Sequence, residues 1–239
     1  MPCRSMPDPV RATGQLSRLA CQSLLLLALL CIDIASVRSV ESDIVLPARV
    51  LDAAELKYGA GARQRLVAWQ QLVGAAHGRP EADKLRLVND FFNTIPFVSD
   101  LEHWGREDYW ATPTEMLASN GGDCEDFSIG KYFSLVALGV SIDKLRITYV
   151  KARDYNPVSQ AHMVLTYYAT PGAMPLVLDN LIPEIKPASQ RPDLTPVYSF
   201  NGDGLWLAKA RGDGKAVKGG SGNISLWRGL IARMGKEFQ

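Results

Sequence analysis

The chain has 239 residues, of which 26 are Lys or Arg and 25 are Asp or Glu. Residues 1–39 hold four of these bases and two of these acids, so the rest of the chain carries 22 bases and 23 acids. This balance excludes the broad basic surface of nucleic-acid-binding proteins and the polybasic patch of many membrane-surface proteins. A body of roughly 200 residues is long enough for one domain with a full hydrophobic core.

The N-terminal segment, residues 1–39, has the pattern of a secretory signal. A basic stretch is followed by a short apolar run and then by small residues; these are Arg4, Arg11 and Arg18, then residues 19–32, then Ala35, Ser36 and Ser39. The run is shorter than the ~20 apolar residues of a membrane-spanning helix, and Asp33 closes it. We therefore expect a periplasmic protein that begins between residues 36 and 40, with an uncleaved anchor as the alternative.

Helices are expected in the first half of the body. The apolar spacing predicts one helix over residues 62–77 and a second that begins at Pro80, a residue suited to a first helical turn. After an aromatic-rich loop, residues 112–115 (Thr-Pro-Thr-Glu) are typical of a helix start. A further helix is expected over residues 125–138. It is apolar on nearly every face, so it should be buried at the centre of the domain.

Strands are expected in the second half, which predicts an α+β fold with an antiparallel sheet. The expected strands are residues 145–151, 161–169, 176–181, 197–200 and 205–207. The glycine-rich and basic residues 209–223 are expected to form a flexible linker, followed by a short amphipathic helix over 225–234. The predicted organisation is thus a leader (1–39), one domain (40–208), and a linker with a C-terminal helix (209–239).

Cys124 is the only cysteine outside the leader. Exported domains mostly use cysteines in pairs, so a lone thiol has no structural partner. It follows Gly121 and Gly122 and stands at the first turn of the expected central helix, where the helix dipole lowers a thiol pKa. This position predicts a nucleophile on a rigid support.

A nucleophilic thiol needs a base and a group that orients the base. Among the three histidines, His77 is expected at a helix end and His103 in the aromatic loop, whereas His162 begins an expected strand. We favour His162 as the base; its other interpretation is a structural strand histidine. Neighbouring strand residues point to opposite faces, so only one of Asp179 and Asn180 can face it. Asp179 is favoured because a carboxylate in an apolar strand is costly unless paired, with a strand-end turn role as the alternative.

Three acids flank the thiol: Asp123, Glu125 and Asp126. Carboxylates in a first helical turn complement the helix dipole, which alone accounts for one or two of them. Three acids around a reactive thiol oppose formation of the thiolate unless a cation neutralises them. Oxygen ligands from a loop suit Ca²⁺, although the spacing matches no EF-hand.

Four segments together resemble the bacterial transglutaminase-like cysteine proteinases, within the transglutaminase-like, papain-related superfamily. They are Tyr109-Trp110-Ala111-Thr112-Pro113, Gly122-Asp123-Cys124-Glu125-Asp126-Phe127, Ala161-His162-Met163-Val164-Leu165 and Leu178-Asp179-Asn180-Leu181. The resemblance covers about residues 45–208. It implies a fold in which the nucleophile heads a central helix packed on an antiparallel sheet, with Cys124 as nucleophile, His162 as general base and acid, and Asp179 as orienter.

The same resemblance implies a cofactor, a substrate and a regulator. The acids beside Cys124 match the calcium-binding acids of the family. The motifs are most similar to those of periplasmic adhesin proteases, which implies cleavage of a large cell-surface adhesin near its membrane-retained N-terminal region, at a site with paired alanines, and hence biofilm dispersal. It also implies sequestration by an inner-membrane receptor that senses cyclic di-GMP.

Two other functions fit the same residues. The same three residues can pass an acyl group to an amine, as in a transglutaminase or amidase, and incorporation of amine would distinguish this from peptide release. In a non-catalytic binding module, Cys124 would be an inert buried thiol that resists alkylation near neutral pH.

Overall fold

The computed structural model describes residues 41–153, 159–207 and 215–239. The expected secretory leader, residues 1–39, lies outside the described residues. Among the described helices, none combines the length and the apolar character needed to cross a membrane.

The described helices follow the sequence expectation closely. They are α2 (Ala48–Tyr58), α3 (Ala60–Ala76), α4 (Glu81–Phe92), α5 (Asp100–Trp104), α6 (Pro113–Ser119), α7 (Cys124–Ala137) and α8 (Ser225–Glu237). The four helices expected in the first half are confirmed as α3, α4, α6 and α7, with ends shifted by a few residues. Helices α2 and α5 were not expected. Gly59, at φ +84°, separates α2 from α3 in a backbone region that favours glycine.

The expected antiparallel sheet is also present. Its strands are β1 (Leu145–Arg153), β2 (Ser159–Tyr167), β3 (Leu176–Leu178), β4 (Lys186–Pro187), β5 (Leu194–Phe200), β6 (Leu205–Leu207) and β7 (Lys215–Ala216), and their order within the described residues is β4-β3-β2-β1-β5-β6-β7. The strand expected to reach residue 181 ends at Leu178. There Asp179 Oδ1 accepts the backbone N–H of Leu181 at 3.0 Å, and this side-chain turn ends the strand.

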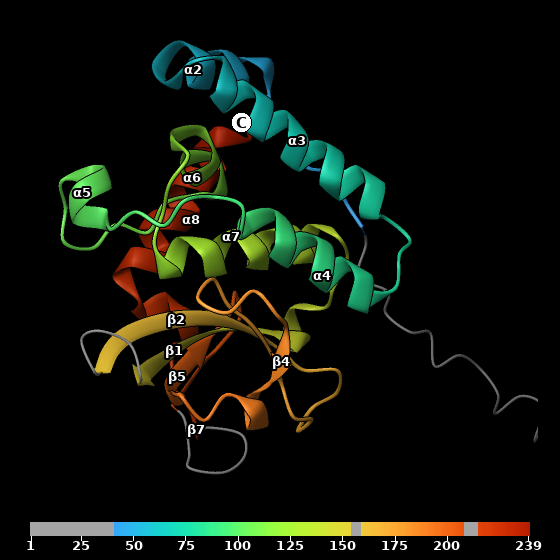
Figure 1. Ribbon diagram of the computed structural model, residues 1–239, viewed down its shortest axis with the longest axis vertical. Helices are drawn as coiled ribbons and strands as arrows, with labels where there is room; N and C mark the ends of the chain where they lie inside the picture. Colours follow the sequence, from blue (N-terminus) through green and yellow to red (C-terminus); the bar gives the residue numbers. More distant parts are fainter. Residues whose placement is uncertain (1–40, 154–158, 208–214) are drawn as a thin grey trace, which may run out of the picture. The chain divides into compact units, whose positions relative to one another are not determined.

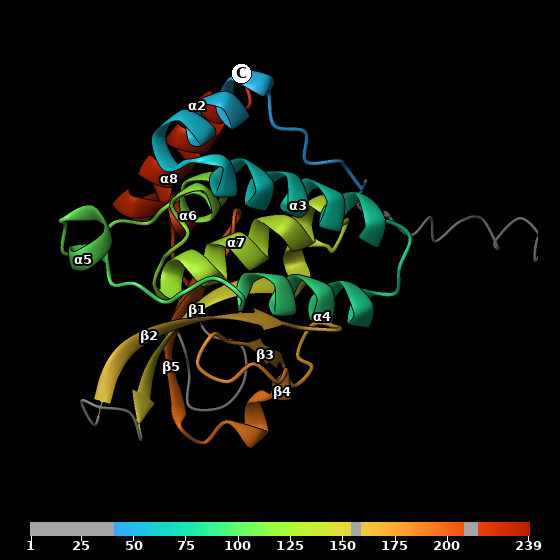
Figure 2. The same cartoon turned by 45° about the horizontal axis from the view of Figure 1, so that its top comes forward.

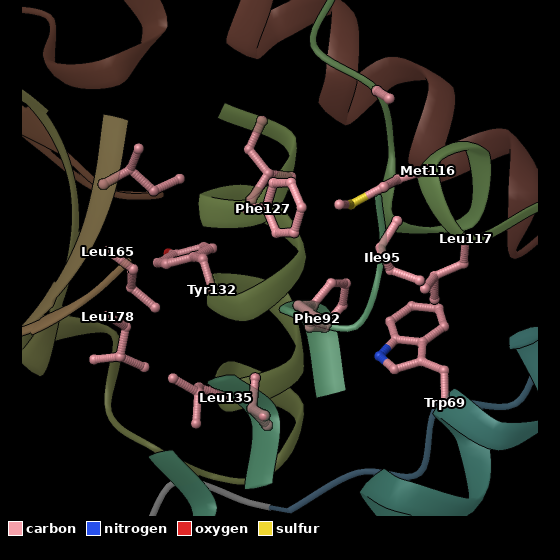
Figure 3. Close-up of a cluster of buried hydrophobic side chains, with 14 of the residues drawn as sticks. Trp69, Phe92, Ile95, Met116, Leu117, Phe127, Tyr132, Leu135, Leu165 and Leu178 are labelled. Atoms are coloured by element: carbon pink, nitrogen blue, oxygen red, sulfur yellow. The ribbon is translucent and has the colours of Figure 1, made fainter. Parts of the chain in front are cut away.

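Helix α7 lies between the sheet and the other helices of the first half (Figures 1 and 2). Figure 3 shows Phe127, Tyr132 and Leu135 of α7 between two groups of apolar side chains. The sheet contributes Leu165 and Leu178, and the outer helices and loops contribute Trp69, Phe92, Ile95, Met116 and Leu117. The expectation of a buried central helix is therefore confirmed, and its N-terminal residue has a rigid support.

The C-terminal stretch is more ordered than the sequence indicated. Of the expected linker, residues 209–214 lie outside the described residues, but β7 pairs with β6 and a short 3₁₀ helix (Gly220–Asn223) follows. Helix α8 packs on the body through the buried side chains of Trp227 and Leu230, and Trp227 stacks on Phe133 of α7. The expected helix is confirmed, and it belongs to the main core.

Candidate active site

Cys124 is the first residue of α7, and the double glycine before it is tightly enclosed. A Cβ on Gly121 would lie 2.8 Å from the His103 ring, and one on Gly122 would lie 2.8 Å from a carboxylate oxygen of Asp126. The Gly122 carbonyl accepts the Val98 N–H at 2.9 Å, which ties this approach to the preceding loop. Only glycines fit between these neighbours, and the close packing fixes the backbone that leads into Cys124.

The sulfur of Cys124 has one hydrogen-bonding neighbour on each side. Its thiol donates to Glu125 Oε2 at 3.1 Å, and the backbone N–H of Met163 on β2 faces it from the sheet. Burial, followed by the charges of Glu125 and Asp123, raises the pKa of the Cys124 thiol well above its usual value. Burial and the neighbouring acids thus raise the pKa of the Cys124 thiol, whereas the sequence position alone favoured a lowered one.

His162, on β2, and Asp179, directly after β3, form a buried pair. His162 Nε2 lies 2.8 Å from Asp179 Oδ1, and the two residues are 2% and 1% exposed. Burial alone would raise the pKa of Asp179. The hydrogen bond and charge of His162, the Leu181 N–H and Arg191 together lower it to about 2. Asp179 is therefore an ionised acceptor, so Nε2 of His162 carries the proton and Nδ1 is the ring nitrogen with a free lone pair.

Three further residues hold Asp179. Arg191 Nη2 donates to Asp179 Oδ2 at 2.7 Å, while Asn93 Nδ2 and Lys131 Nζ donate to its backbone carbonyl at 2.9 and 3.1 Å. Lys131 is 1% exposed, and burial lowers its pKa to about 7. These contacts could not be predicted from local sequence patterns, because each joins residues that lie 12 to 86 positions apart.

The acids beside Cys124 form a cluster with two more acids, Asp100 at the start of α5 and Asp108 in the loop after that helix. Oxygens of Asp100, Asp123 and Asp126 lie within 4.8 Å of one another, and so do those of Asp100, Asp108 and Glu125. Burial, followed by the charge of Glu125, raises the pKa of Asp123 to about 8, and burial raises that of Asp100 to about 6. Burial also raises the pKa values of Glu125 and Asp126. Within residues 41–153, 159–207 and 215–239, no lysine, arginine or histidine forms an ion pair with these acids.

The cluster fits a divalent cation with oxygen ligands. Asp100 Oδ1 and Asp123 Oδ1 are buried and have no hydrogen-bond partner in the described residues, so each offers a lone pair to a ligand. Asp126 differs, since its two oxygens accept the N–H groups of Ala111 at 2.7 Å and Asp123 at 3.3 Å in a capping box. Of the three acids expected to bind metal, Asp123 and Glu125 have the freer oxygens, and Asp126 stays a weaker prediction.

Comparison with known proteins identifies the chain's family. The model of the bacterial transglutaminase-like cysteine proteinases matches residues 69–195. The chain belongs to this family. No curated protein matches it.

Solved structures of Legionella pneumophila LapG are similar to this cysteine proteinase. The EGTA-treated form of LapG is 42% identical with a TM-score of 0.69, and the match covers 81% of this chain and all of that one. The calcium-bound form is 43% identical with a TM-score of 0.66 and covers 80% of this chain and 99% of that one. The resemblance to the family and the transglutaminase-like α+β fold, both expected from the sequence, are confirmed.

The remaining histidines have structural surroundings. His103 Nε2 lies 2.8 Å from Ser119 Oγ, its ring packs edge-on against Trp104, and His77 lies 3.6 Å from Asp43. Within the part of the chain that the structure describes, neither histidine contacts Cys124 through a hydrogen bond or ion pair, so His162 stays the favoured base of this cysteine proteinase. Asp100 and Arg191 were not expected from the sequence; Asp100 begins the short helix α5, and Arg191 is a single basic residue between β4 and β5.

Proposed function

We propose that this cysteine proteinase is a calcium-dependent endopeptidase of the periplasm that uses Cys124, His162 and Asp179. The observation that carries the proposal is the buried His162–Asp179 pair, next to a strand residue whose N–H faces the helix-terminal thiol. A base oriented by an ionised acid beside a nucleophile is the arrangement that acyl-transfer enzymes share.

The proton route follows from the tautomer of His162. Nε2–H donates to Asp179, so Nδ1 accepts the proton of the Cys124 thiol as the sulfur attacks the peptide carbonyl carbon. The backbone N–H of Cys124, at the free start of α7, is placed to donate to the oxyanion that forms. Collapse breaks the C–N bond, and the leaving amine takes the proton from His162. A thioester remains on Cys124.

Water then completes the reaction. His162 Nδ1 takes a proton from the water as its oxygen attacks the thioester carbonyl, and it returns that proton to the sulfur when the acid product leaves. Asp179 stays ionised throughout and stabilises the imidazolium that exists between the two transfers. Attack by an amine in place of water would give the transglutaminase outcome from the same thioester.

Asp100, Asp123 and Glu125 are the residues that would hold calcium, with Asp108 and Asp126 at the border of the cluster. Their support is the buried, unpartnered oxygens of Asp100 and Asp123, and the similarity to a LapG that binds calcium. Bound calcium would supply the positive charge that this group of acids lacks. The start of α5, which carries Asp100, and the start of α7, which Asp123 precedes, would then be held together by shared ligands.

The proposed substrate is the N-terminal region of a large cell-surface adhesin, so that cleavage releases the adhesin and promotes biofilm dispersal. This follows from the motifs and from the likeness to LapG over nearly its whole length. The proposed regulator is an inner-membrane receptor that senses cyclic di-GMP and sequesters the protease. Co-purification of the protein with host membranes, with and without cyclic di-GMP, tests this partner.

The decisive experiment incubates the purified protein with envelope fractions of the native host, with and without a calcium chelator. N-terminal sequencing of released fragments identifies the cleavage site, and a labelled amine reports acyl transfer. We expect release of a large surface protein in calcium only, with no amine incorporation. Amine incorporation without peptide release would favour the transglutaminase, and release that persists in chelator would remove calcium from the proposal.

A further inference from the structure

Arg191 connects the proposed catalytic acid to a second carboxylate. Its Nη2 donates to Asp179 Oδ2 at 2.7 Å and to Asp193 Oδ2 at 2.8 Å, and its Nε donates to Asp193 Oδ1 at 3.0 Å. Arg191 is 2% exposed. One side of the guanidinium therefore reaches inward to Asp179, and the other is held by Asp193.

The backbone around Arg191 fixes this geometry. The residue follows a short 3₁₀ helix (Ala188–Gln190), where its N–H donates to the Ala188 carbonyl at 3.1 Å. Its own carbonyl accepts the Leu194 N–H at 3.1 Å, which closes a turn containing Pro192. Proline restricts the backbone of that turn, so Arg191 and Asp193 are kept on the same side of it.

Stability alone does not account for this arrangement. Moving two charges from water into a protein interior costs about as much as their attraction returns, and apolar replacements of buried ion pairs are often neutral or stabilising. Asp179 Oδ1 already accepts from His162 and from Leu181, so Arg191 is needed only for the orientation of the other oxygen. A carboxylate held at both oxygens cannot rotate away from the imidazole.

We propose that Arg191 is a positioning residue of the proteolytic reaction, which acts on His162 by fixing the carboxylate of Asp179, with Asp193 as its clamp. This inference rests on the proposed function of His162 and Asp179. It predicts that loss of Arg191 lowers kcat and leaves KM nearly unchanged, because no contact with substrate is removed.

Histidine NMR tests the proposal on the full chain. The protein has three histidines, so selective ¹⁵N labelling gives a spectrum that single-histidine variants assign. In wild type, Nε2–H of His162 should give a downfield signal that Asp179→Asn removes. Arg191→Met should shift or broaden this signal and lower kcat roughly 100-fold, the size of effect that a misplaced catalytic group produces. Arg191→Lys should lie between, because lysine keeps the charge and lacks the planar fork.

Lys84→Met is the matched control. Lys84 is also a buried cation paired with a carboxylate, that of Glu41, and its other hydrogen bond among the described residues goes to the Leu138 carbonyl, away from His162 and Asp179. It should lower the melting temperature without moving the His162 signal or kcat. If Arg191→Met does not fold, Arg191→Lys and Asp193→Asn make the same comparison, with smaller losses expected in the same direction.

The proposal is overturned if the folded Arg191 variants keep both the His162 signal and kcat of wild type. Failure of the proposed function is a separate result, since wild type would then cleave no envelope protein in the presence of calcium. The NMR comparison still decides whether Arg191 fixes the His162–Asp179 pair in that case.

Discussion

Asp179 and Asp123 are both carboxylates packed into the same site, yet their pKa values move in opposite directions. That of Asp179 falls to about 2, whereas that of Asp123 rises to about 8. Burial raises both. The difference lies in the neighbours, because Asp179 meets His162 and Arg191, whereas Asp123 meets the like charges of Glu125 and Asp108. Asp179 is paired with positively charged neighbours, whereas the acids around Asp123 have no cationic side chain paired with them among the described residues.

The comparison separates two tasks within one site. In the sheet region, Asp179 already orients His162 through a hydrogen bond between protein side chains, so no ligand is needed there. The acidic region, Asp100 with Asp123 and Glu125, is crowded by like charges and lies directly against the nucleophile. We infer that the first region makes the chemistry possible and that the second makes it dependent on a cation.

The largest expected effect is on the nucleophile shared by the two regions. Cys124→Ala should lower cleavage of the envelope substrate on the order of 10⁴-fold or more, because no thioester can form. His162→Ala should be nearly as inactive, and the double variant no worse than either, as expected for members of one catalytic unit. Circular dichroism should show an unchanged fold. Substantial cleavage by the alanine variant would overturn the assignment of Cys124.

The sheet region is tested by exchanging neighbouring residues. Asp179→Asn should lower kcat by roughly 10²- to 10⁴-fold, because an amide no longer fixes the tautomer of His162. Asn180→Ala is the matched control one residue along the chain, and we expect it to keep nearly full activity. If Asn180→Ala lowered activity and Asp179→Asn did not, the assignment of Asp179 as the partner of His162 would be wrong.

The acidic region is tested by calcium binding, measured by titration calorimetry. Asp100→Asn and Asp123→Asn should each weaken binding roughly 10- to 100-fold, as the loss of a site-building contact typically does. Asp83→Asn is the control: Asp83 is a half-buried acid of α4 that lies outside the cluster, and the variant should bind calcium as wild type does. Mg²⁺ should replace calcium poorly, since it needs a tighter octahedral shell. If both cluster variants bound calcium as tightly as wild type, Asp100 and Asp123 would not be calcium ligands, and the acids beside Cys124 would serve only to complement the helix dipole.

The smallest expected effect concerns Lys131, the buried cation behind Asp179. Its pKa is about 7 in the folded protein against 10.5 ordinarily, so the unfolded chain binds more protons between these values. Stability should therefore rise with pH from about 7 to about 10. Relative to Lys131→Met, the wild-type melting temperature should gain roughly 5–9 °C between pH 7 and pH 9. Parallel pH profiles of the two proteins would show that Lys131 is charged in the fold.

The fold could be predicted from local patterns. The capping box at Thr112, the apolar helix over residues 125–138 and the β-rich segments each report a structure formed by near neighbours in sequence. The strand predicted through residue 181 was too long, because the turn made by the Asp179 side chain was not recognised. The packing of α8 on the core was missed because its Trp227 meets Phe133 of α7 and Phe200 of β5, which are distant from it in sequence.

The site could be predicted in part. Cys124, His162 and Asp179 stood out by residue type and motif, and the structure joins the last two directly. Asp100 and Arg191 did not, because their meaning depends on long-range contacts that no local pattern carries. The catalytic roles stay predictions, as does the periplasmic leader that lies outside the described residues.

The dependence of the chemistry on the acidic region is tested most directly by following binding and cleavage over one calcium titration. Calorimetry and the cleavage rate should be recorded on the same preparation, first of wild type and then of Asp100→Asn. We expect the half-maximal cleavage rate to fall at the calcium dissociation constant, and the variant to shift both curves together. A cleavage rate that stays constant from excess chelator to saturating calcium would contradict the account.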